Sequence, residues 1–282
     1  MQDEQSSIFE LSLLGFFNGL SLIGMKYLHS SRAMVRFRQA PATEVPLWSW
    51  GLIPAVLVAY LLIPGIIALA LEDNLDIGLH SEEGSFSASS LAGGYLLGGG
   101  LVAFFIWQHV VGTLRQPPAT LGICGAPLAN LPPFILFYGL FFPPLLLLGI
   151  LWAGLLEKLG HEAVPQEAVR MFTEAFSRGE GLEIALLVFN AVVLAPLWEE
   201  LMFRGVFFGL LRSRSGTGSA LVLSSAVFAA YHLSLDALLP LFFVGLALGY
   251  IYDRTRSIYF AILFHALFNS VMLFIQWLLA GS

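Results

Sequence analysis

Long apolar stretches recur along the whole chain and are separated by short polar segments. At a rise of about 1.5 Å per residue, most are long enough to cross about 30 Å of hydrocarbon as a helix, and two are shorter. The pattern predicts eight membrane-spanning helices, at residues 8–27, 47–71, 91–111, 134–155, 182–211, 218–232, 237–252 and 258–279. Because the gaps leave no room for a soluble domain, we expect an all-α, polytopic integral membrane protein.

The composition supports a membrane protein. Hydrophobic residues make up 57% of the chain and charged residues 11%, with a mean hydropathy of +0.81, far from the usual soluble range. The net charge of -6 comes mostly from acidic loops, which argues against nucleic acid as a partner. The only cysteine, Cys124, excludes an intramolecular disulfide and any multi-cysteine metal site.

Basic residues divide unevenly between the two sides of the predicted membrane. The loops after spans one, three, five and seven hold Lys26, Arg32, Arg36, Arg38, Arg115, Arg212, Arg214, Arg254 and Arg256. The opposite loops hold only Lys158, Arg170 and Arg178. Since Lys and Arg concentrate in cytoplasmic loops, we expect both termini on the extracytoplasmic side. Acidic residues precede the first span and no small-residue cleavage site follows it, which argues against a removable signal peptide.

Two further patterns concern helix packing. Residues 165–176 place apolar and charged side chains at helical spacing, which favours an interfacial helix. We interpret it as an amphipathic connector in preference to a substrate-guiding element. Gly93, Gly94 and the glycines at 98–100 fall in the third span, where small residues allow helices to approach closely.

Three ionisable residues lie inside one very apolar stretch. Glu199 and Glu200 are adjacent, and Arg204 follows four residues after Glu200. Residues four apart share a helix face, so Glu200 and Arg204 are expected to pair. Glu199 is rotated by about 100° from Glu200 and lacks that partner. Charged groups at membrane depth are unfavourable and usually functional, so Glu199 is the candidate working carboxylate.

Two histidines in late spans can meet this carboxylate. His232 follows Phe228 by four residues, and His265 precedes Asn269 by four, so each pair shares a helix face. Counted from the predicted cytosolic helix ends, Glu199, His232 and His265 lie at depths of about 14 to 24 Å. A carboxylate and an imidazole can remove a proton from water, while a second imidazole and a carboxamide can stabilise an oxyanion. The set suits the attack of water on an amide carbonyl.

These residues resemble a known family. Glu199-Glu200-x-x-x-Arg204, Phe228-x-x-x-His232 and His265-x-x-x-Asn269, in this order on successive spans, are similar to motifs of the CPBP family. This family includes CAAX prenyl endoproteases of the Rce1 type and bacterial Abi or lysostaphin-resistance-like intramembrane proteases. The resemblance implies a protease core at 182–282, preceded by four further transmembrane helices at 1–181.

The resemblance also implies roles. Glu199 would activate water with help from His232. His265 and Asn269 would form the oxyanion hole, while Glu200, Arg204 and Phe228 would support the site.

No cofactor is favoured. If zinc is present, Glu199, His232 and His265 are its expected ligands. The expected location is a bacterial or archaeal plasma membrane, and the expected partners are the lipid bilayer and a membrane-anchored protein or peptide substrate, possibly lipidated or C-terminally sorted.

Two other functions stay open. A non-catalytic scaffold or immunity protein could use the same helical core, with the buried polar cluster as a helix clamp. A secondary transporter could use buried acids as a proton relay, although the chain shows no matching halves of the kind that transporters have.

Overall fold

The computed structural model describes residues 19, 21, 52–74, 87–164 and 166–280, and within them every regular element is helical. The predicted first span, at 8–27, lies outside the described residues except for 19 and 21. The elements are α2 (Leu52–Asn74), α3 (Ala88–Gly94), η1 (Tyr95–Gly99), α4 (Gly100–Trp107), η2 (Gln108–Thr113), η3 (Pro118–Leu121), η4 (Leu128–Asn130), α5 (Leu131–Lys158), α6 (Glu167–Arg178), α7 (Gly181–Phe189), η5 (Asn190–Leu194), α8 (Ala195–Glu200), η6 (Leu201–Phe208), α9 (Gly209–Tyr231), α10 (Leu235–Thr255) and α11 (Ile258–Ala280).

Five helical runs in the described part are long and apolar enough to cross a membrane. They are Ala88–Thr113, Leu128–Lys158, Gly181–Tyr231, Leu235–Thr255 and Ile258–Leu278, with a shorter apolar helix at Val58–Leu71. The prediction of an all-helical protein with several membrane-length helices is thus confirmed, whereas a total of eight spans is not shown. Of the predicted amphipathic segment at 165–176, residues 167–176 lie in α6, which packs against α7 and α11, and residue 165 is outside the described residues.

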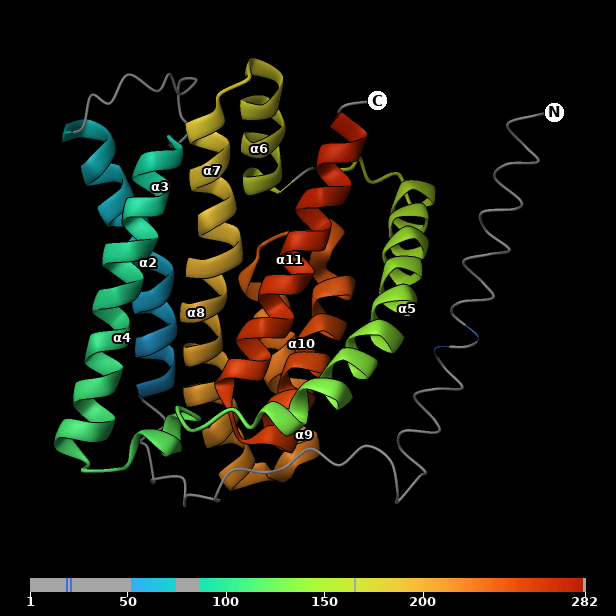
Figure 1. Ribbon diagram of the computed structural model, residues 1–282. Coiled ribbons are helices and arrows are strands. Elements are labelled where there is room, and N and C mark those ends of the chain that lie inside the picture. Colours follow the sequence, from blue (N-terminus) through green and yellow to red (C-terminus); the bar gives the residue numbers. More distant parts are fainter. Residues whose placement is uncertain (1–18, 20, 22–51, 75–86, 165, 281–282) are drawn as a thin grey trace.

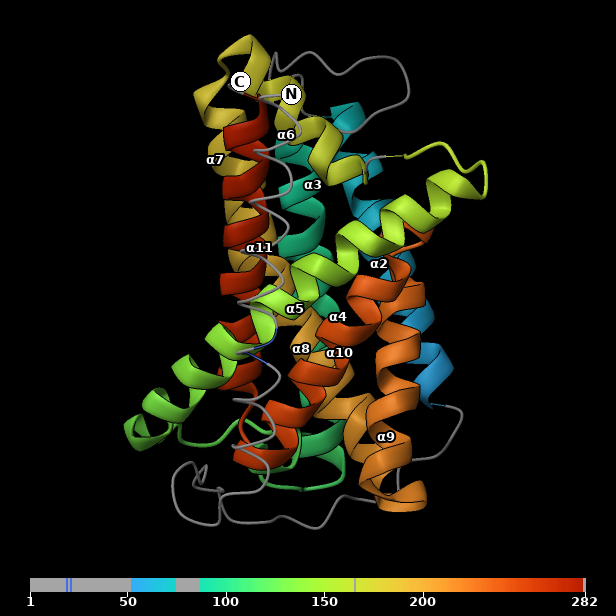
Figure 2. The ribbon, with the colours of Figure 1, turned by 90° about the vertical axis from the view of Figure 1, so that its right-hand side faces the viewer.

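The longest run is bent at one glycine. Gly216 has φ 79° and ψ 170°, a combination that is not helical and that glycine adopts readily. The chain passes down through α7 and α8, turns near the start of α9 and returns (Figures 1 and 2). The 51-residue run therefore contains two arms, which correspond to the separate spans predicted at 182–211 and 218–232.

The late helices form the centre of the bundle. α10 packs against α9, α5 and α11, while α11 packs against α8 and η5. In Figure 2 α5 crosses the upright α11 obliquely, and its Phe134 ring makes an edge contact with Phe264 of α11. α2, α3 and α4 form a group on the other side of α7 and α8 (Figure 1). The α8 segment is thus enclosed by both groups.

Glycines let the early helices approach closely, as their clustering predicts. A Cβ atom on Gly94 would lie 2.4 Å from the carbonyl oxygen of Pro64, and one on Gly98 would lie 2.6 Å from the Pro64 Cα, so α2 rests directly on α3 and η1. Gly99 faces α8, because a Cβ atom on Gly99 would lie 2.3 Å from Cδ1 of Trp198 in that helix. The early helices are therefore fixed against the segment that carries Glu199.

This contact predicts a stability effect. Gly99→Ala should lower the free energy of unfolding by about 1–3 kcal/mol, because the new methyl group overpacks the Trp198 ring. Gly100→Ala is the matched control, since a Cβ atom at Gly100 meets nothing within 4 Å. Denaturant unfolding in detergent micelles measures both. A Gly99→Ala protein as stable as the Gly100→Ala protein would contradict the contact.

Candidate functional site

The paired glutamates sit on a short helix between two π-helical segments. α8 ends at Glu199 and Glu200, with η5 before it and η6 after it. All eight residues of η6 are buried. π-helical turns widen the backbone and occur often at functional sites. Both glutamates are buried, at 4% exposure for Glu199 and 0% for Glu200.

Glu200 forms the buried ion pair that the sequence predicts. Its Oε1 accepts a hydrogen bond from Nη1 of Arg204 at 3.1 Å, and both side chains are fully buried. Arg204 Nη2 also donates to the carbonyl oxygen of Gly245 in α10 at 3.2 Å. The guanidinium carbon lies 4.7 Å from the centre of the Phe228 ring. A carboxylate, a carbonyl and an aromatic face together compensate the buried cation.

His265 links this ion pair to Glu199. Its Nδ1 lies 2.9 Å from Oε1 of Glu200, and because a carboxylate only accepts, Nδ1 carries the proton. The other ring nitrogen, Nε2, then faces Glu199 and lies 4.0 Å from its Oε2. Glu200 therefore orients His265 as well as neutralising Arg204, a second role that the sequence spacing does not reveal.

His232 approaches Glu199 from another helix. Its Nδ1 donates to the Phe228 carbonyl oxygen at 2.8 Å, so a neutral ring has its lone pair on Nε2. This Nε2 lies 3.9 Å from Oε2 of Glu199. The Phe228 ring makes edge contacts with both imidazoles, with ring centres 4.9 Å from His232 and 5.7 Å from His265. The Phe228 ring therefore packs against Arg204 and against both imidazoles.

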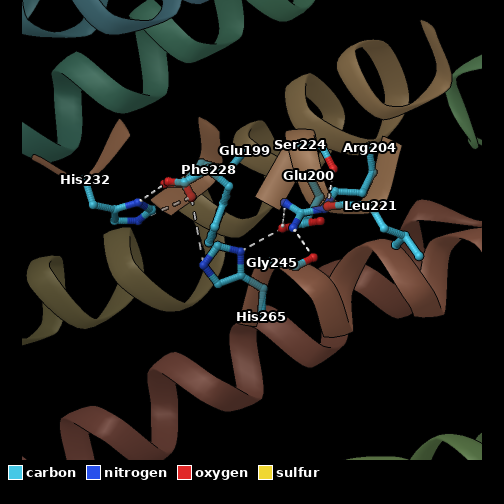
Figure 3. A network of polar contacts seen from close by, with 9 residues as sticks. All are labelled: Glu199, Glu200, Arg204, Leu221, Ser224, Phe228, His232, Gly245 and His265. Atoms are coloured by element: carbon cyan, nitrogen blue, oxygen red, sulfur yellow. Dashed lines mark hydrogen bonds and ion pairs between the residues drawn. The ribbon is translucent and has the colours of Figure 1, made fainter. Parts of the chain in front are cut away.

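One carboxylate oxygen faces both imidazoles (Figure 3). Oε2 of Glu199 makes no hydrogen bond to the residues that the structure describes. Its separations of 3.9 and 4.0 Å from the two Nε2 atoms are too long for direct hydrogen bonds and are of the length that one bridging water spans. The geometry suits a carboxylate that shares a water molecule with an imidazole.

Asn269 has a backbone partner on another helix. Its Nδ2 donates to the backbone carbonyl oxygen of Ala191 at 2.7 Å. The bond ties α11 to the π-helical segment η5. The structure therefore brings Glu199, Glu200, Arg204, Phe228, His232 and His265 together, while the Asn269 amide is engaged with the backbone of another helix.

A cavity of about 730 Å³ reaches Glu199 and His232. Its other lining residues come from helices and connections outside the motifs: Tyr60, Pro64, Gly65, Ala68, Leu91, Tyr95, His161, Val164, Gln166, Ala168, Tyr231, Leu233, Ser234, Leu235 and Asp236. The connection between α5 and α6 is held to the start of α10, because Oδ2 of Asp236 lies 3.1 Å from Nε2 of His161 and accepts from the Val164 amide at 3.3 Å. The cavity thus extends from the glutamate toward the end of the bundle where α6 lies.

Sequence reasoning missed these wall residues. Tyr60, Tyr95 and Tyr231 carry hydroxyl groups in otherwise apolar helices. Such tyrosines are common in membrane helices, and no motif places them beside Glu199. The only sequence feature that indicates them is a tyrosine hydroxyl group within an apolar span.

The zinc alternative has no complete ligand set in this geometry. In the part of the chain that the structure describes, no group of three or more His, Cys, Asp or Glu side chains is arranged to hold a metal ion. Zinc binds nitrogen and oxygen ligands at about 2.0–2.2 Å. Glu199, His232 and His265 would have to move closer together to bind the ion.

Comparison with known proteins points to the same half of the chain. Residues 181–271 match the family model described as Type II CAAX prenyl endopeptidase Rce1-like. The chain is also similar to the candidate membrane peptidase YdiL of Bacillus subtilis (strain 168), with 28% identity over 93 residues. That match covers 33% of this chain and 38% of the relative. No solved structure was found to match the chain.

Proposed function

Because residues 181–271 form an Rce1-like CAAX prenyl endopeptidase domain, we propose that the protein is an intramembrane endopeptidase that uses water activated by Glu199. Its substrate would be a membrane-associated protein. The observation that carries the proposal is the Oε2 atom of Glu199, which faces Nε2 of both His232 and His265 without a direct hydrogen bond.

The reaction would begin at this carboxylate. Water held between Glu199 and His232 gives a proton to the Glu199 carboxylate while its oxygen bonds to the scissile carbonyl carbon. The π-electron pair of the carbonyl moves onto its oxygen. When the tetrahedral intermediate collapses, the carbon–nitrogen bond breaks and the amine leaves with the proton that Glu199 accepted. Every step uses side chains that line the site, and no covalent enzyme intermediate forms.

Hydrogen bonds donated by His265 and Asn269 would stabilise the negative oxygen of the tetrahedral intermediate. Since Nδ1 of His265 already donates to Glu200, His265 can donate from Nε2 only as an imidazolium ion. The Glu200 carboxylate beside it compensates that charge. Asn269 can take part with its second amide hydrogen, because the first is donated to Ala191. Glu200 and Arg204 act as positioning residues, since they hold His265 and α8 in place.

The arrangement also supports an orientation. Five arginines belong to segments at the lower end of Figure 1: Arg115 follows η2, Arg212 and Arg214 lie near the start of α9, Arg254 lies at the end of α10, and Arg256 follows α10. Lys158, Arg170 and Arg178 belong to the end with α6. By the positive-inside rule we expect the lower end to face the cytosol, in a bacterial or archaeal plasma membrane. The end of α11 then lies on the outer side, and the same side is expected for the N-terminus, which lies outside the described residues. The cavity then extends toward the outer side, which disfavours cytosolic prenylated proteins as substrates.

A comparison of protein termini tests the proposal. Membranes from cells that carry either the wild-type protein or the Glu199→Gln variant are analysed for the N- and C-termini of membrane proteins. We expect a small set of new termini with the wild type alone. Identical sets of termini in the two samples would argue against a protease.

The buried network also suits the non-catalytic alternative, because Glu200, Arg204 and His265 join α8, η6, α10 and α11 as a helix clamp would. A clamp does not need the unpaired oxygen of Glu199. If the Glu199→Gln protein changes no termini but keeps the biological role, the scaffold function is favoured over the protease.

Metal analysis tests the water mechanism against the zinc alternative. Purified protein should contain no stoichiometric zinc, and chelation by EDTA should leave cleavage unchanged, because Glu199 and His232 activate water without a Lewis acid. The measurement is elemental analysis paired with an activity assay before and after chelation. Stoichiometric zinc that is lost together with activity would instead assign Glu199, His232 and His265 as ligands.

A further inference from the structure

Tyr60 brings a buried hydroxyl group to the cavity from outside the matched domain. It belongs to α2, whereas the family match covers 181–271. The side chain is 1% exposed, and its hydroxyl oxygen makes no hydrogen bond to the residues that the structure describes. Tyr60 and Glu199 line the same cavity.

A buried hydroxyl group without a partner is unfavourable by about 1–3 kcal/mol. A tyrosine whose only task is packing could be a phenylalanine, which avoids this penalty. Oε2 of Glu199 is also closed to solvent and without a hydrogen bond to a described residue. The two unsatisfied oxygens therefore belong to residues that line one cavity, and an acceptor such as a substrate carbonyl would satisfy Tyr60.

The position of Tyr60 is set by close packing. Its ring lies 5.8 Å, centre to centre, from that of Tyr231, the residue next to His232. One turn further along α2, Pro64 rests on Gly94 and Gly98, where no side chain could intervene. A donor held this firmly needs little reorganisation when charge develops on a nearby oxygen.

The oxyanion site has room for a further donor. His265 offers one N–H group once it is protonated, and Asn269 can offer only its second amide hydrogen, because the first is donated to Ala191. Oxyanion sites generally combine two or more donors. We propose that the Tyr60 hydroxyl group donates a hydrogen bond to the carbonyl oxygen of the scissile peptide bond as that oxygen becomes negative. This role rests on the proposed endopeptidase function.

The bond changes are those of the proposed hydrolysis, with one addition. As the water oxygen bonds to the carbonyl carbon, the π-electron pair moves to the carbonyl oxygen, which accepts the Tyr60 O–H group as a hydrogen bond. Tyr60 keeps its proton throughout. When the intermediate collapses, the pair returns and the amine leaves with the proton from water. No further reactant is required.

Kinetics of Tyr60→Phe test the role. Loss of one oxyanion donor should lower kcat by about 10²- to 10³-fold, while KM is unchanged because the donor acts on the developing charge. Tyr138→Phe is the matched control, since its hydroxyl oxygen is also buried without a partner in the described part but Tyr138 stacks on Phe134 in α5, away from the cavity. Tyr138→Phe should keep wild-type kcat. Equal kcat for Tyr60→Phe and wild type would overturn the role.

Inhibitor binding distinguishes an oxyanion role of Tyr60 from a purely structural role. A phosphinic peptide, whose phosphinate oxygen mimics the oxyanion, should bind Tyr60→Phe more weakly by the same factor as kcat falls, whereas the product peptide should bind equally. Equal weakening for both peptides, together with a lower melting temperature, would mean that Tyr60 only supports the fold. The proposed function itself fails if the wild type and Tyr138→Phe cleave no protein beyond those that Glu199→Gln cleaves. In that case the role of Tyr60 fails with it.

Discussion

Replacing Glu199 with glutamine should lower kcat by about 10³-fold, because glutamine has nearly the same shape but accepts no proton from water. The fold should be kept, since the Glu199 Oε2 atom makes no hydrogen bond to described residues that would be lost. The measurement is cleavage of a substrate identified from the comparison of termini, together with the melting temperature.

Glu174→Gln serves as the control for this change. Glu174 lies on α6, is about one third exposed and pairs with Arg170. We expect wild-type cleavage from this variant. Wild-type cleavage by Glu199→Gln would contradict the base role, and a large loss of stability would show that Glu199 supports the fold instead.

Replacing Arg204 with leucine should lower the free energy of unfolding by about 3–5 kcal/mol, because it leaves the Glu200 carboxylate buried without its cation. Glu200 and Arg204 are both fully buried, and Arg204 also holds the Gly245 carbonyl of α10. Unfolding by denaturant in micelles measures the effect.

A surface pair of the same spacing provides the control. Arg170 and Glu174 are also four residues apart at 2.7 Å, but they are about one third exposed. Arg170→Leu should change stability by at most about 1 kcal/mol, as exposed ion pairs contribute little. If Arg204→Leu lowers the free energy of unfolding no more than Arg170→Leu does, the buried pair is not important for stability.

Contacts within one helix were predictable from the sequence. The Glu200–Arg204 pair follows from four-residue spacing, and the helices follow from the apolar pattern. The direction of the two Glu199 and Glu200 side chains also follows, because neighbours on a helix point about 100° apart.

Contacts between helices depend on how each helix is rotated, which spacing does not determine. The sequence indicates that His265 and Asn269 share a face, yet in the structure His265 meets Glu200 while Asn269 reaches Ala191 of η5. The π-helical segments around α8 change the helical phase there, and no sequence motif marks them. Tyr60 was missed for a related reason, since only the packing of α2 on Gly94 and Gly98 brings it to the cavity.

Water activated by Glu199 should attack the substrate directly, and trapping the acyl group during turnover tests this step. Cleavage is run in H₂¹⁸O with hydroxylamine present, and the new C-terminus is analysed by mass spectrometry. Direct attack predicts one ¹⁸O atom in the new carboxylate and no hydroxamate. A hydroxamate at the new C-terminus would reveal a covalent acyl-enzyme and contradict the account.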